Sequence, residues 1–104
     1  MTPFGLETES MGNRATLRLV GELDVVSAPQ LRDTVSALIS KGKAHLTFDC
    51  SSLDFIDSTG LGVLIGARAR ALAANGSVAL AGVKPAMQRL LVVTGIESLF
   101  ASAA

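Results

Sequence analysis

The chain has 104 residues, which is long enough for one hydrophobic core and predicts one domain. Hydrophobic residues make up 49% of the sequence and aromatic residues only 4%, so we expect a folded protein with an aliphatic core. Nine Lys and Arg residues balance nine Asp and Glu residues, and a chain without net charge is a poor candidate for direct binding of nucleic acid.

Cysteine and histidine usage argues against disulfides and metal sites. Cys50 and His45 are the only residues of their kinds, too few for an internal disulfide or a tetrahedral metal site. The N-terminus carries Glu7 and Glu9 where a signal peptide would carry basic residues. The longest apolar run, residues 60–67, is far shorter than the ~20 residues of a membrane span. We therefore expect a cytoplasmic protein without membrane insertion, metal or cofactor.

The first part of the chain predicts a hairpin and a helix. Apolar and polar residues alternate over residues 15–19, as in a strand with one buried face, and residues 4–10 are expected to pair with it across a Gly-Asn turn. Ser27 and Gln30 form a capping box, which predicts that a helix begins there and ends near residues 41–43.

A second strand is predicted over residues 44–49, and a loop of Ser, Asp and large apolar residues is expected after it. A helix follows from Thr59 to Asn75. Its buried face is expected to hold Leu61, Ile65, Ala69 and Leu72. Val63 lies on the opposite side of the helical wheel, so we expect its side chain to be exposed.

The last elements are a strand and a helix. Residues 78–81 form a short apolar run, which suits a strand buried on both faces, and Pro85 begins a helix that Gly95 ends. Helices and strands thus alternate along the chain. The predicted fold class is α/β, with a small mixed β-sheet made of an N-terminal hairpin and then parallel crossovers, and with helices packed on it.

The segment Asp57-Ser58-Thr59-Gly60 lies between a predicted strand and a predicted helix and is the best candidate for a functional site. Ser58 occupies the expected N-cap position, where its hydroxyl would accept a hydrogen bond from a free N–H group. The same position suits a phosphoserine, because the positive end of the helix dipole stabilises an anion. Both interpretations stay open. Gly62 and Gly66 are expected to let the helix approach a neighbouring element closely.

Two catalytic interpretations of this segment fail on particular residues. A hydrolase nucleophile needs a glycine two positions before Ser58, where Ile56 stands, and no histidine follows in the sequence. A magnesium-dependent phospho-aspartate receiver needs an acidic pair at the end of its first strand, whereas Glu22 and Asp24 are not adjacent. We expect no enzymatic activity.

Three segments in this order and spacing resemble the STAS domain of bacterial anti-sigma factor antagonists: Gly21-Glu22-Leu23-Asp24, Leu46-Thr47-Phe48-Asp49, and Asp57-Ser58-Thr59-Gly60-Leu61-Gly62. The similarity runs from about Gly12 to Phe100. It implies a single STAS domain over residues 1–104. Many members continue with another helix where this chain ends in Ala101-Ser102-Ala103-Ala104, so we expect an abbreviated C-terminal end.

The resemblance implies a partner switch. The unphosphorylated protein would bind an anti-sigma factor that is also a serine kinase and so release a sigma factor. Phosphorylation of Ser58 by that kinase would end the complex, and a phosphatase would restore it. The implied partner-binding residues are Asp24, Asp57, Ser58, Thr59, Gly60 and Val63.

Two other functions stay open. STAS domains also serve as constitutive interaction modules in transport and stress-signalling complexes, where Ser58 would only cap a helix. Binding of a nucleotide or another small molecule at the helix terminus near Gly60 is the third possibility.

Overall fold

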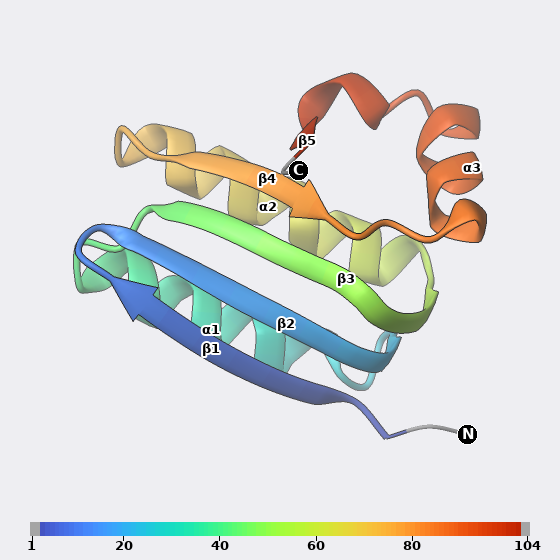
Figure 1. The fold of residues 1–104 in the computed structure, drawn as a ribbon, viewed down its shortest axis with the longest axis horizontal. Coiled ribbons are helices and arrows are strands. Elements are labelled where there is room, and N and C mark those ends of the chain that lie inside the picture. The colour runs from blue at the N-terminus through green and yellow to red at the C-terminus, as the bar shows by residue number, and fades with distance from the viewer. Residues whose placement is uncertain (1–2, 103–104) are drawn as a thin grey trace.

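The computed structural model describes residues 3–102. They form one mixed sheet of five strands in the order β1-β2-β3-β4-β5 (Figure 1). β1 is antiparallel to β2, and β3, β4 and β5 each run parallel to the preceding strand. The strands are β1 (Gly5–Met11), β2 (Arg14–Leu23), β3 (His45–Ile56), β4 (Ser77–Ala81) and β5 (Ala101–Ser102). The predicted mixed sheet with an N-terminal hairpin is confirmed.

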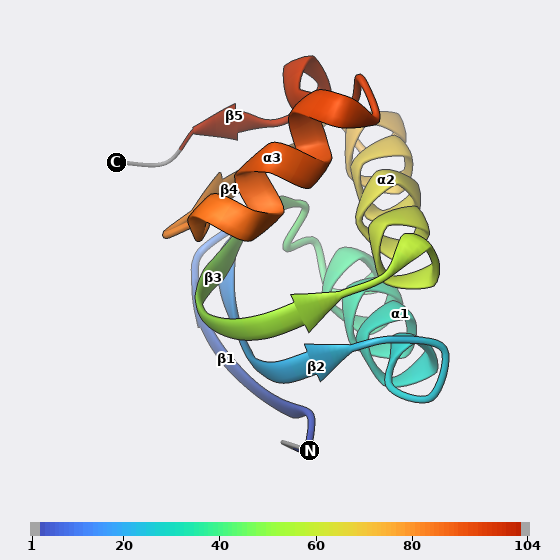
Figure 2. The same ribbon diagram turned by 90° about the vertical axis from the view of Figure 1, so that its right-hand side faces the viewer.

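The helices are α1 (Ala28–Ser40), α2 (Ser58–Ala73), α3 (Pro85–Val93) and the short 3-10 turn η1 (Glu97–Leu99). Figure 2 shows α1 and α2 side by side on one face of the sheet, with α3 at one end of the molecule. The opposite face of the sheet carries exposed polar side chains such as Thr16 and Arg18. Within residues 3–102 no helix combines the length and apolar character that crossing a membrane requires.

Most of the core lies between the sheet and the pair α1 and α2, and α3 adds Met87 and Leu91. Phe48 is the only aromatic side chain among the buried residues that the structure describes. Alternate residues of β2 and β3 point into the core, as the sequence pattern predicts. Its fully buried members include Leu17, Leu19, Leu31, Leu46, Phe48 and Leu64.

β3 is longer than predicted. The expected loop after Asp49 is wrong, because the strand continues to Ile56 and pairs with β2 as far as Leu23. The register between β2 and β3 shifts twice, between Arg18 and Val20 and between Gly21 and Glu22, and at each shift β3 carries one residue more than β2. β bulges of this kind bend a strand without ending its pairing, so the polar residues of the segment do not interrupt it.

β4 is buried on one face only. Val78 and Leu80 are buried, whereas Ala79 and Ala81 are half-buried, so the prediction of a strand covered on both faces is wrong. The reason is that α1 and α2 lie on one face of the sheet (Figure 2).

The orientation of α2 also differs from the prediction. Val63 is only 5% exposed and Ala67 is fully buried, whereas Leu72 is 46% exposed, so the expectation of an exposed Val63 is wrong. α2 contacts α1 as well as β3 and β4, so it buries a wide stripe. Residues 61–65 are apolar almost all round, and such a segment does not define its buried face. The stripe comprises Gly60, Leu61, Val63, Leu64, Ala67 and Ala71.

Candidate functional site

The ends of two neighbouring parallel strands position the site. Leu23 at the end of β2 pairs with Ile56 at the end of β3, so Asp24 and Asp57 leave the sheet at the same edge. The backbone N–H of Asp57 donates a hydrogen bond of 3.2 Å to the carbonyl oxygen of Leu23. This bond ties the turn that begins α2 to the turn that begins α1.

The turn after β2 is held by Asp24 and Ser27. The Asp24 carboxylate accepts hydrogen bonds from the backbone N–H groups of Val26, at 3.0 Å, and of Ser27, at 3.2 Å. The Ser27 hydroxyl donates to the carbonyl oxygen of Glu22 at 2.9 Å and accepts from the Asp24 N–H, also at 2.9 Å. The predicted capping box is therefore wrong, because this hydroxyl faces back along the turn and caps no helical N–H.

Asp24 thus shapes its own turn. Among residues 3–102, no hydrogen bond connects its carboxylate to the Ser58 hydroxyl. Asp24 is half-buried, so part of it faces solvent at the rim of the site.

Asp57 is the N-cap of α2. Its carboxylate accepts a hydrogen bond of 2.9 Å from the Gly60 N–H, and its carbonyl oxygen accepts one of 3.0 Å from the Leu61 N–H. The prediction that the Ser58 hydroxyl caps this helix is therefore wrong. Ser58 is the first residue of the helix and is exposed, while Thr59 is half-buried. The capping function and the exposed hydroxyl belong to adjacent residues.

Gly60 permits the close contact between the two turns. A Cβ atom at this position would lie 2.8 Å from the Leu23 carbonyl oxygen and 2.8 Å from Ile56 Cγ1. Gly62 and Gly66 have no heavy atom within 4 Å of such a Cβ, so the prediction that these two allow a close approach is wrong. The tight packing lies at the first turn of α2, next to Ser58.

The structure adds three apolar residues that the sequence prediction missed. Val25 is 66% exposed, Val26 is 85% exposed and Phe55 is 49% exposed. They lie at the carboxyl ends of β2 and β3, the same edge of the sheet as Ser58. A pair of valines in a turn is the signal that could have revealed this surface, because turns usually carry polar residues. We call Asp24, Val25, Val26, Phe55, Asp57, Ser58 and Thr59 the switch face.

The switch face, in the part of the chain that the structure describes, contains no cysteine or histidine side chain. The Cys50 thiol is buried, and burial raises its pKa to about 12, so it stays protonated. Among the residues that the structure describes, no group of three or more His, Cys, Asp or Glu side chains could hold a metal ion. What the switch face offers is an exposed hydroxyl beside two carboxylates and three apolar side chains, a mixture suited to reversible protein binding.

Comparison with known proteins gives this arrangement a family. A family model described as "Mlab, STAS domain" matches residues 6–101. The anti-sigma-B factor antagonist of Bacillus subtilis (strain 168) is 33% identical over 96 residues, which cover 92% of this chain and 87% of the relative.

Two solved structures share the fold. SpoIIAA, a Bacillus cell fate determinant solved in the phosphorylated form, has a TM-score of 0.76 and 27% sequence identity, with 98% of this chain and 92% of that chain covered. An anti-sigma factor antagonist from Mycobacterium paratuberculosis has a TM-score of 0.82 and 24% identity, with 94% and 83% covered. At 24% identity, the similarity to the Mycobacterium paratuberculosis structure shows a shared fold and nothing more.

Fold and site together define a small α/β regulatory domain with two linked turns at one edge of its sheet. The chain belongs to the STAS domain family. Relatives in this family are named as anti-sigma factor antagonists, which are regulators and not enzymes. That residues 1–104 form one domain stays a prediction.

Proposed function

We propose that this protein is an anti-sigma factor antagonist, and that phosphorylation of Ser58 controls its binding to an anti-sigma factor. The observation that carries the proposal is the exposed Ser58, which directly follows a capping Asp57, in a chain 33% identical to an anti-sigma-B factor antagonist. A related fold has been solved in a phosphorylated form, which is consistent with this chemistry.

The sign of the effect follows from charge and solvation. A phosphate adds roughly −1.5 to −2 charges at neutral pH. At Ser58 it would stand beside the Asp57 carboxylate, which already accepts the hydrogen bond from the Gly60 N–H. A partner that packs against Val25, Val26 and Phe55 would have to remove water from that charge. Phosphorylation therefore opposes binding.

The fold itself need not change. The cap of α2 uses the Asp57 carboxylate, and the turn after β2 uses Asp24 and Ser27, so none of these bonds depends on the Ser58 hydroxyl. A phosphate on Ser58 would alter the surface and leave the backbone of both turns in place.

The partners under this proposal are an anti-sigma factor with serine kinase activity and a phosphatase that restores Ser58. The proposed contact surface is the switch face together with the backbone at Gly60. The prediction that Val63 contacts the partner is wrong, because its side chain is buried in the core. Release of a sigma factor would place the protein in the bacterial cytoplasm.

Affinity capture from a lysate of the source cells tests the proposal, with wild type, Ser58→Ala and Ser58→Glu as baits and mass spectrometry of the retained proteins. We expect Ser58→Ala to retain an anti-sigma factor with a kinase domain and Ser58→Glu to lose it. The purified partner and ATP should then phosphorylate wild type at Ser58 and leave Ser58→Ala unmodified.

Melting curves of the three baits provide the control, and they should coincide because Ser58 makes no capping bond. Equal retention of the anti-sigma factor by Ser58→Ala and Ser58→Glu would contradict the switch.

A second candidate function is a constitutive STAS interaction module in a transport or stress-signalling complex. The matching family model is described as "Mlab, STAS domain" and not as an antagonist, and this description supports the second candidate. In that case all three baits retain the same subunit of such a complex, and no phosphate is found on Ser58.

A further inference from the structure

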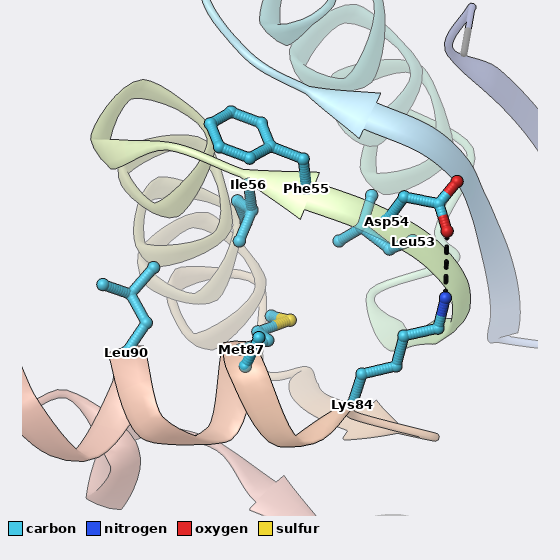
Figure 3. Close-up of a pocket in the computed structure, with 8 residues that line it drawn as sticks. Leu53, Asp54, Phe55, Ile56, Lys84, Met87 and Leu90 are labelled. Atoms are coloured by element: carbon cyan, nitrogen blue, oxygen red, sulfur yellow. Dashed lines mark hydrogen bonds and ion pairs between the residues drawn. The ribbon is translucent and has the colours of Figure 1, made fainter. Parts of the chain in front are cut away.

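A cleft lies between the end of β3 and helix α3. Pairing between β3 and β4 stops at Asp49 and Ala81, whereas β3 continues to Ile56. α3 lies alongside the part of β3 that extends beyond β4, and the two elements enclose a cavity of about 260 Å³ (Figure 3). Its apolar lining consists of Leu53, Phe55, Ile56, Ala86, Met87 and Leu90.

The cleft has an apolar floor, and its rim carries one positive and one negative side chain that form an ion pair. Leu53, Ile56 and Met87 are buried. Lys84 and Asp54 form an ion pair of 3.0 Å at the rim, and their side chains are 42% and 52% exposed. Figure 3 shows this pair to one side of the apolar residues. Because the two charges cancel, the cleft favours an uncharged apolar group.

The cleft is large enough for one large apolar side chain. Its volume of about 260 Å³ is close to the lower end of the range, about 300 Å³ and above, of clefts that hold drug-sized molecules. Protein interfaces commonly place one large apolar or aromatic side chain in a pocket of this kind, and such anchors carry much of the binding free energy.

The cleft is continuous with the switch face. Phe55 belongs to both, and Ile56 joins them, since it lines the cleft and its Cγ1 packs against Gly60. Both residues directly precede Asp57 and Ser58 in the chain. A protein that covers Ser58 therefore reaches the mouth of the cleft without crossing another element.

We infer that the cleft between β3 and α3 receives an apolar anchor side chain of the same anti-sigma factor that contacts Ser58. This inference rests on the proposed function. The complex then has two contacts with different chemistry. The anchor supplies affinity through burial of apolar surface, and the surface around Ser58 makes that affinity depend on phosphorylation.

Two tryptophan substitutions on one helix test the inference. Ala86 is exposed and lines the cleft, so Ala86→Trp fills it, whereas Val93 is 83% exposed on the same helix, away from the cleft. Binding is measured by calorimetry with the purified anti-sigma factor that Ser58→Ala retains. We expect Ala86→Trp to weaken binding by about tenfold or more and Val93→Trp to leave it unchanged. Equal affinities of the two variants would overturn the inference.

A photo-cross-linker at position 55 gives a second measurement that leaves the helix untouched. We expect benzoylphenylalanine in place of Phe55 to cross-link to an apolar residue of the anti-sigma factor, and the same group at position 93 to give no product. Absence of a product at position 55 would overturn the inference.

The two proposals fail in different ways. If Ser58→Glu binds as tightly as Ser58→Ala, the proposed phospho-switch fails. If Ser58→Glu loses binding and Ala86→Trp retains it fully, the switch stands and the anchor site is refuted.

Discussion

At Gly60 the chain has a hydrogen where any other residue would place a carbon atom against the end of β2. The nearest atoms to that carbon would be the Leu23 carbonyl oxygen and Ile56 Cγ1, both 2.8 Å away, so the backbone of β2 or the buried Ile56 side chain would have to shift. We expect Gly60→Ala to lower the free energy of unfolding by about 1–3 kcal/mol, the usual cost of overpacking. Urea denaturation measures this change.

Gly62→Ala is the matched control, two residues further along the same helix. Its added methyl group would meet no heavy atom within 4 Å, and alanine is the better helix former. This variant should gain about 0.5–1 kcal/mol. A similar loss of stability in both variants would show that helix propensity, and not contact with β2, decides the effect.

The first turn of α2 holds a capping residue, Asp57, next to the residue proposed as the phosphorylation site, Ser58. Asp57 accepts the hydrogen bond from the Gly60 N–H, and Ser58 stands outside that bond. We expect Asp57→Ala to lower the free energy of unfolding by about 1 kcal/mol through loss of the cap. Ser58→Ala should stay within about 0.5 kcal/mol of wild type, as exposed positions usually do. Thermal melts of both variants measure this. A larger loss of stability in Ser58→Ala than in Asp57→Ala would show that Ser58, and not Asp57, caps the helix.

Elements that bury one side only could be predicted from the sequence. β2 alternates apolar and polar residues, and α1 places Leu31 and Val35 on one face. Each pattern therefore defines which face of the element is buried. α2 is apolar on most sides, and its orientation depends on where α1 and the sheet lie, which no local pattern contains. The end of β3 was missed for a related reason, since only its partner strand shows that the polar residues there remain paired.

The stability of the whole molecule should depend on pH through Cys50. Burial raises the pKa of this thiol from its ordinary value of 9.0 to about 12. Between these two values the unfolded chain loses the proton and the folded chain keeps it, so the free energy of unfolding falls as pH rises. The stabilisation is complete below about pH 9.

Comparison with Cys50→Ala isolates this effect, because the loss of packing in that variant does not vary with pH. Denaturation at pH 8 and at pH 10.5 should show the difference in stability between wild type and Cys50→Ala shrinking at the higher pH. A difference that stays constant would mean that the thiol is ionised equally easily in both states.

The candidate site was only partly predictable for a reason that lies in the tertiary arrangement. Asp24 stands in one short motif and Asp57 and Ser58 in another, and local sequence reveals both. The cleft beside Phe55 forms because β3 extends beyond the end of β4 and α3 lies against that extension of β3. This arrangement brings together segments that are distant in the chain. The exposed Val25 and Val26 become informative only once the ends of β2 and β3 are known to share an edge.

The hydrogen bond from the Asp57 N–H to the Leu23 carbonyl oxygen has a consequence for protein engineering. It makes residues 22–27 and 55–60 one mechanical unit, although they belong to different turns. If only one of the two segments were replaced by that of a relative, the replaced turn would have to pack against this protein's own second turn at the close contact around Gly60. An exchange of recognition between STAS domains should therefore transfer both segments together, with the hairpin and the remaining helices left as they stand.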